Sequence, residues 1–152
     1  MRRASVRFFA LFLTAIALGP GMAHLLALPN KILLPRADYL TVQQIYRGWA
    51  LLGFVAYAAM GFTVMPVIQS RRDRRAFALT LAALLLLIAS QGVFWTFTFP
   101  VNQATNNWTN LPDDWERLRS RWEYSRAAGA LLTMSALAVL IAAVVKERDG
   151  IR

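Results

Sequence analysis

Apolar residues gather along the chain into four long runs that are almost free of charge. Each run is about 20 residues long, which is the length an α-helix needs to cross ~30 Å of hydrocarbon. Strands of a membrane β-barrel would instead be ~10-residue segments of alternating polarity, and no such segments occur. The pattern predicts an all-α, up-and-down four-helix transmembrane bundle. We expect one domain, with outer loops at 29–41 and 100–125 and spans at about 8–28, 46–68, 76–99 and 126–146.

Local signals predict where the later helices begin and end. Thr41 and Gln44 have capping-box spacing, so we expect the second helix to run from Val42 to about Gln69. Pro100 should close the third helix, because the residue before a proline avoids the helical region. Helix signals resume at Pro112, and an unbroken helix from there to Lys146 would be ~50 Å long.

The first run also fits a second interpretation. Three arginines precede it, and Gly21-Met22-Ala23 resembles the cleavage site of a secretory signal peptide. The apolar run continues to Leu28, which is longer than the core of a usual signal peptide. We therefore expect this segment to be retained as a span, with cleavage after residue 23 as the alternative.

The distribution of charge predicts the orientation of the bundle in the membrane, and the composition excludes several classes of function. Most Lys and Arg residues flank the spans on the side that holds both termini and the short segment 69–75, so this side is predicted to be cytoplasmic. The chain has 152 residues, 57% of them apolar and 16% charged, with a net charge of +9. Such a composition indicates contact with lipid headgroups in a bacterial inner membrane and argues against nucleic-acid binding. Without cysteine and with one histidine, the sequence also predicts no metal site and no cofactor.

The polar residues within the spans concentrate in the outer part of the bilayer. Each helix contributes there, whereas the inner half is almost purely apolar. Because polar side chains in a membrane are costly, they mark a site, and we predict a pocket that opens to the outer face. Those near the spans' outer ends are His24, Gln43, Tyr46, Arg47, Gln91, Trp122, Glu123 and Arg126.

The fourth helix carries an aromatic and arginine stripe that suits a planar or anionic ligand. Its members, Trp115, Arg119, Trp122 and Arg126, recur at i, i+4, i+7 and i+11. Glu123 has the spacing to pair with Arg119 or with Arg126. An interfacial aromatic belt also explains the outer tryptophans and tyrosines without any ligand, and a hydrogen bond to a neighbouring helix is the alternative role for Gln91.

Two segments resemble a known family. Phe99-Pro100-Val101-Asn102 followed by Trp122-Glu123-Tyr124-Ser125-Arg126 is similar to the closing motif of small four-helix membrane proteins that include the anthrone oxygenases. His24–Lys31, which contains Asn30, and Gln43–Trp49 are similar to the opening half of bacterial members. Members often carry histidine where this chain has Arg126.

The resemblance implies cofactor-free oxidation of an electron-rich phenolic substrate. A base would form the carbanion that meets oxygen, and His24 is the base candidate, because imidazole has an ordinary pKa near neutrality. Arg126 and Arg47 would stabilise the phenolate. The other candidate ligand-binding residues are Asn30, Lys31, Gln43, Tyr46, Gln91, Trp95, Asn102, Trp115, Arg119, Trp122 and Glu123.

Three functions stay open at this point. The first is a binding protein whose outer pocket holds an apolar aromatic or quinone-like molecule. The second is the oxygenase-like enzyme. The third is an accessory subunit of a membrane complex, which needs no pocket, and a homo-oligomer is compatible with each of them.

Overall fold

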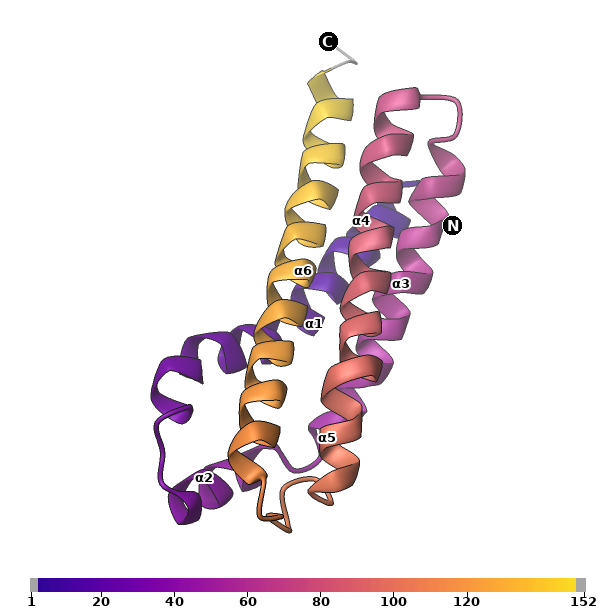
Figure 1. Cartoon of the computed structure of the whole chain (residues 1–152). Helices are drawn as coiled ribbons and strands as arrows, with labels where there is room; N and C mark the ends of the chain where they lie inside the picture. Colours follow the sequence, from indigo (N-terminus) through magenta and orange to yellow (C-terminus); the bar gives the residue numbers. More distant parts are fainter. Residues whose placement is uncertain (1–2, 150–152) are drawn as a thin grey trace.

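The structure, a computed structural model, describes residues 3–149, with side chains as far as residue 146. Four long helices form a bundle, and no strand occurs in the described part of the chain (Figure 1). All four are long and apolar enough to cross a membrane. The predicted all-α four-helix bundle is therefore confirmed, and the chain is a multi-pass membrane protein. The long helices are α1 (Arg3–Lys31), α3 (Leu52–Gln69), α4 (Arg74–Val93) and α6 (Trp115–Asp149).

The four long helices pack in a closed ring, in which each helix contacts two others. Helix α1 packs against α3 and α6, and α4 packs against the same two helices. The short segment 70–73 joins α3 to α4 at one end, which we call the turn end (Figure 1). Segments 32–51 and 105–114 lie at the opposite end, which we call the loop end.

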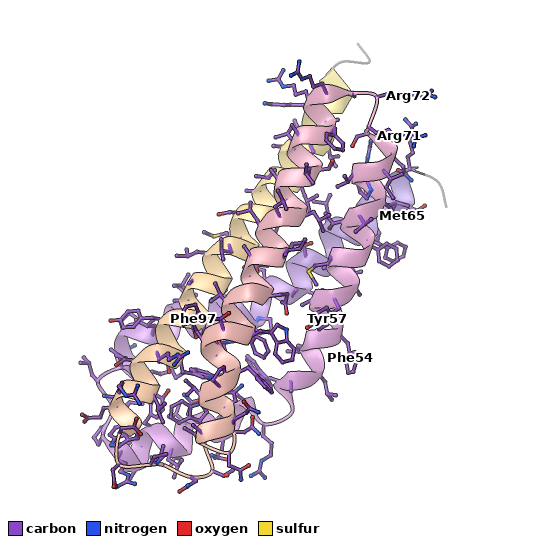
Figure 2. All side chains as sticks on the ribbon, turned by 45° about the vertical axis from the view of Figure 1, so that its right-hand side comes forward. Phe54, Tyr57, Met65, Arg71, Arg72 and Phe97 are labelled. Carbon is purple, nitrogen blue, oxygen red and sulfur yellow. The ribbon has the colours of Figure 1, made fainter. Side chains whose placement is uncertain are left out.

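Large apolar side chains cover the outside of the bundle, as they do in a protein solvated by lipid. Phe54 is 74% exposed, and Tyr57 and Met65 lie exposed along the same helix, with Arg71 and Arg72 at the turn end (Figure 2). The interior is built from alanine and from hydroxyl side chains that bond backbone carbonyls of their own helix. Buried examples are Ala59, Ala83, Ala136, Thr14, Thr63 and Thr80.

Two of the central helices approach each other closely at a glycine. A Cβ placed on Gly21 of α1 would lie 3.2 Å from the Cβ of Ala130 in α6. Any larger side chain at this position would push the helices apart. This contact lies just below the loop end, about one turn before His24.

The predicted start of the second helix is wrong. The chain forms α2 (Arg36–Gln43) directly after Pro35, then the two 3₁₀ turns η1 (Gln44–Tyr46) and η2 (Trp49–Leu51), before α3 begins. Thr41 lies inside α2 and donates to the Ala37 carbonyl instead of capping a helix. Between the two turns Gly48 has φ of +86°, a backbone conformation that favours glycine and ends the helical path.

The prediction that Pro100 closes the third helix is also wrong. After α4, a π-helical segment, η3 (Phe94–Thr98), leads into α5 (Phe99–Ala104). The extra residue of a π turn accommodates Pro100 at the start of α5. Pro100 has no N–H to offer to the Thr96 carbonyl, and Arg121 Nη2 donates to that carbonyl at 2.8 Å. A partner from another helix thus replaces the missing backbone bond.

The last loop folds back into the protein. Asn106, Asn107 and Trp108 all have positive φ, and the Trp108 side chain is buried. Helix α6 starts at Trp115, three residues later than predicted, because Pro112 belongs to a turn in which its carbonyl accepts from the Trp115 N–H. From there α6 runs unbroken to Asp149, so the predicted helix continues through residues 115–125 of the outer segment and the fourth span.

Candidate functional site

A buried carboxylate is the centre of a polar cluster at the loop end. The side chain of Glu123 is fully buried, and one of its oxygens, Oε1, receives three donors. Lys31 Nζ lies 2.7 Å away, the Tyr39 hydroxyl donates at 2.9 Å and Gln43 Nε2 donates at 3.3 Å. The other oxygen, Oε2, is buried without a hydrogen-bond partner among the described residues.

Three elements supply these groups, and each has a local reason for its position. Lys31 is the last residue of α1, where a cation suits the negative end of the helix dipole. Tyr39 and Gln43 are four residues apart on the short helix α2, so both point to one side of it. Glu123 lies on the third turn of α6. The loop 32–35 brings α2 alongside α6, and this places all four side chains together.

Aromatic rings enclose the ion pair. The Lys31 ammonium lies 4.6 Å from the ring centroid of Tyr46 and 5.0 Å from that of Trp122. Such cation–π contacts lower the cost of removing a charge from water. Since Lys31 is only 3% exposed, these rings and Glu123 take the place of solvent around it.

His24 lies beside the same rings. Its imidazole centroid is 4.3 Å from that of Tyr46, 4.9 Å from that of Trp122 and 5.8 Å from that of Trp49. The side chain is 2% exposed, and Nδ1 has no hydrogen-bond partner in the described structure. A histidine held by rings alone keeps a nitrogen available to a molecule that enters the cluster.

Arg126 adds a second cation one turn along α6 from Glu123. Its guanidinium lies 5.9 Å from the Trp122 ring centroid, and its Nε is buried without a hydrogen-bond partner among the residues described. No carboxylate of residues 3–146 lies within 4.0 Å of it. Arg126 is nevertheless close enough to interact electrostatically with His24, Lys31 and Glu123.

The two tyrosines of the cluster stay neutral. Burial raises the pKa of the Tyr39 hydroxyl above its ordinary value, and the negative charge of Glu123 raises it further. Burial and Glu123 raise the pKa of Tyr46 in the same way. Both hydroxyls are therefore hydrogen-bond donors at neutral pH and not bases.

The loops cover the cluster from the end of the bundle. Gln44 Nε2 donates to the Trp108 carbonyl at 2.9 Å, and Trp108 packs edge-on against Tyr39 and Trp122. Trp122 Nε1 donates to Asn102 Oδ1 at 2.7 Å, which fixes the orientation of the indole. These contacts join the two loop segments to each other and join both segment 105–114 and α5 to Trp122 of α6.

The structure brings half of the predicted site residues into one cluster. These seven, which we call the loop-end cluster together with Tyr39, are His24, Lys31, Gln43, Tyr46, Trp122, Glu123 and Arg126. Asn102, Trp115 and Arg119 border it. Arg119 does not pair with Glu123 as its spacing allowed, since it donates to the Leu34 carbonyl and lies over the Tyr39 and Trp115 rings.

The remaining predicted residues lie apart from the cluster. Asn30 and Arg47 are exposed, and Arg47 donates to Gln44 Oε1. Trp95 is exposed and donates to the Tyr57 hydroxyl on the outer surface. Gln91 is half-buried on α4, and among the described contacts it makes none to the cluster.

Tyr39 was missed as a site residue, because it was assigned to the interfacial aromatic belt. Its spacing of four residues from Gln43 was the available signal. The cluster combines an ion pair, an imidazole and hydroxyl donors, which are groups of the kind that hold charged and polar ligands. In the described part of the chain, no group of His, Cys, Asp and Glu side chains is arranged to hold a metal ion.

Comparison of the chain with protein-family models, with curated proteins and with solved structures finds no match.

Proposed function

We propose that the protein binds a small aromatic or quinone-like molecule at the loop-end cluster. The observation that carries the proposal is a set of buried polar atoms without partners, gathered in one place. Natural proteins satisfy nearly all buried polar groups, and exceptions require an explanation. Here His24 Nδ1, Gln43 Oε1, Glu123 Oε2 and Arg126 Nε are unpaired in the described structure. A ligand with polar groups would pair them.

The cost of the cluster supports the same proposal. A buried ion pair rarely stabilises a protein more than apolar side chains of the same volume would. Ionisable residues within membrane spans are correspondingly rare and usually functional. The cluster places Lys31, Glu123 and Arg126 at the ends of two spans, at a depth where apolar residues would pack without penalty.

Entry of a ligand would require one segment to move. Aromatic rings fill the space around His24, and two of them, Tyr46 and Trp49, come from the irregular segment 44–51. The two short 3₁₀ turns of this segment are joined at Gly48, so it lacks the continuous hydrogen bonding of a helix. Displacement of these rings would open the cluster while leaving the four long helices in place.

The charge distribution supports an orientation for the site. Arginines 71, 72, 74 and 75 crowd the turn end, which by the positive-inside rule would face the cytoplasm. The loop end would then face outward, and in a bacterial inner membrane the ligand would enter from the outer leaflet or the periplasm.

Co-purification tests the binding proposal. The protein is purified in mild non-ionic detergent, and the bound material is extracted and identified by mass spectrometry. We expect a stoichiometric aromatic or quinone-like molecule, which is lost from the double variant Lys31→Met/Glu123→Leu. The matched control is Asp114→Asn, which removes an exposed carboxylate paired with Arg117 at the same end.

Two results would contradict binding at this site. One is recovery of bulk phospholipid alone, with a second protein in fixed ratio, which is what an accessory subunit of a membrane complex would give. The other is an aromatic molecule that is retained equally by the double variant.

A second candidate function is favoured by His24. Its Nδ1 has no hydrogen-bond partner among the described residues, so it is the atom that would accept the proton of an acidic C–H in a phenolic or anthrone-type substrate. Oxidation of the ring methylene to a carbonyl would consume one O₂ and release one water. The resemblance to anthrone oxygenases supports this candidate, with Arg126 beside the base. Arg47 is exposed and is dropped from the proposed mechanism.

Oxygen uptake with an anthrone tests this candidate. Loss of a positioned base typically costs ~10²-fold or more in rate, so His24→Ala should lose that factor while ligand binding persists. If His24→Ala oxidises the substrate as fast as the wild type, His24 is not the base and the enzyme proposal fails.

A further inference from the structure

The atoms left unpaired in the loop-end cluster differ in what they require. Glu123 Oε2 and Gln43 Oε1 are acceptors, so each requires a donor from the ligand. Arg126 Nε is a donor and requires an acceptor. His24 Nδ1 is compatible with either, depending on its tautomer. A ligand that satisfies the cluster must therefore offer donor and acceptor groups side by side.

The charges of the cluster are unbalanced as well. The carboxylate of Glu123 lies near two cations, the buried Lys31 and the half-buried Arg126, so the cluster has a surplus of one positive charge. Glu123 Oε1 is already occupied by Lys31, and no other carboxylate of residues 3–146 lies within 4.0 Å of Arg126. A buried charge without a counter-ion is the costly case, and a ligand anion would remove that cost.

The surroundings restrict the remainder of the ligand. The rings of Tyr46, Trp49 and Trp122 border His24, and Trp122 also lies under the Arg126 guanidinium. Once Tyr46 and Trp49 have moved aside, a flat apolar body would take the place of their rings against Trp122, whereas a small inorganic anion would find no compensation there for its lost hydration.

We infer that the ligand carries an ionised acid group next to a hydroxyl or N–H donor, on a flat apolar body. This inference rests on the binding function proposed above and specifies the class of molecule. The acid group would pair with Arg126, and the donor would reach Glu123 Oε2 or Gln43 Oε1. The ionised acid distinguishes this class from a neutral phenol or quinone.

Three naphthalene probes separate the two head-group requirements. These are 3-hydroxy-2-naphthoate, with acid and hydroxyl, 2-naphthoate, with the acid alone, and 2-naphthol, with the hydroxyl alone. Their binding is measured by isothermal titration calorimetry at neutral pH in non-ionic detergent, with detergent without protein as the blank. A charge-assisted hydrogen bond in a buried site corresponds to roughly 10- to 100-fold in affinity. We expect 2-naphthoate to bind the wild type at least tenfold more tightly than 2-naphthol, and 3-hydroxy-2-naphthoate to bind most tightly.

A charge-neutral variant tests the role of Arg126. Arg126→Gln should reduce the preference for 2-naphthoate over 2-naphthol to less than about threefold. The matched control, Arg117→Gln, removes an exposed arginine at the same end and should leave the preference unchanged. If Arg126→Gln does not fold, the comparison of the three probes on the wild type still decides whether the ligand carries an ionised acid group.

The outcomes distinguish this inference from the proposed function. Equal affinity of the wild type for 2-naphthoate and 2-naphthol would overturn the anionic head group and leave a site for neutral aromatic molecules. A preference that persists in Arg126→Gln would overturn the assignment of the acid to Arg126. If no probe binds but a stoichiometric molecule co-purifies, an acid with an adjacent donor supports the inference and a neutral head group overturns it. If no probe binds and nothing co-purifies, the proposed function fails as well.

Discussion

Truncation of Glu123 to alanine is the most informative test of how the loop end is held together. The change leaves the Lys31 ammonium buried without its counter-ion, and it removes the acceptor of Tyr39 and Gln43. Breaking a buried pair from one side costs about 3–5 kcal/mol. The two orphaned neutral donors do not add in full, because the same side chains relax together. We therefore expect Glu123→Ala to lower the free energy of unfolding by about 3–5 kcal/mol.

A double variant isolates the cost of the orphaned charge. Lys31→Met/Glu123→Leu replaces both ions by apolar side chains of similar size, which is often neutral or stabilising for a buried pair. We expect it to recover most of the stability that Glu123→Ala loses. Asp114→Ala is the control at an exposed pair and should cost no more than about 1 kcal/mol.

Unfolding by sodium dodecyl sulfate titrated into non-ionic micelles, followed by tryptophan fluorescence, gives the three free energies. A cost below about 1 kcal/mol for Glu123→Ala would mean that water reaches Lys31 and that the cluster is not sealed. A double variant no more stable than the single one would mean that the orphaned charge is not the source of the loss. Either result would refute the reasoning.

Two further predictions follow from the packing and from the ionisation of the bundle. Gly21→Leu should destabilise the protein by about 1–3 kcal/mol, because a Cβ at this position would already lie 3.2 Å from the Cβ of Ala130. The control Gly19→Leu should not destabilise it, since a Cβ at Gly19 has nothing within 4 Å. Equal effects of the two variants in thermal unfolding would contradict the close approach. Because the pKa of Tyr39 is raised in the folded protein, its contribution to the free energy of unfolding should not change with pH below about pH 10 and should become destabilising above it, where only the unfolded chain releases the proton. Absorbance at 295 nm should show that tyrosinate appears together with unfolding, and Tyr39→Phe should lessen the alkaline loss of stability.

The spans and the depth of the polar residues could be predicted from the sequence, because both depend on distance along the chain. Twenty apolar residues fix a span, and a rise of 1.5 Å per residue puts His24 in the outer part of the first span, toward the end where Glu123 and Arg126 flank the fourth. Several ends of the helices were predicted wrongly, because local signals compete to set them. Pro35 starts a helix before the capping signal at Thr41 is reached, and the helix passes Pro100 because Arg121, from α6, bonds the carbonyl that the proline leaves free.

The partners of Glu123 were beyond sequence reasoning. On an isolated helix, Arg119 and Arg126 are its neighbours at i−4 and i+3, and either could pair with it. In the bundle, the rotation of α6 and the path of residues 32–35 determine which side chains contact Glu123. Its partners are Lys31 and Tyr39, which are distant from it in sequence. Such contacts arise only when α2 lies against α6, and no local pattern specifies that.

The two requirements on the loop-end cluster, stability and binding, can be separated with the same double variant. If Lys31→Met/Glu123→Leu folds as stably as the wild type, the bundle does not need these charges in order to form. Their presence at the ends of two apolar spans then has no structural explanation, since Met and Leu would fill the same space at no cost. A stable double variant that has lost the co-purifying molecule would assign the cluster to binding. A variant that keeps the molecule but unfolds easily would make the cluster a device for docking α2 onto α6.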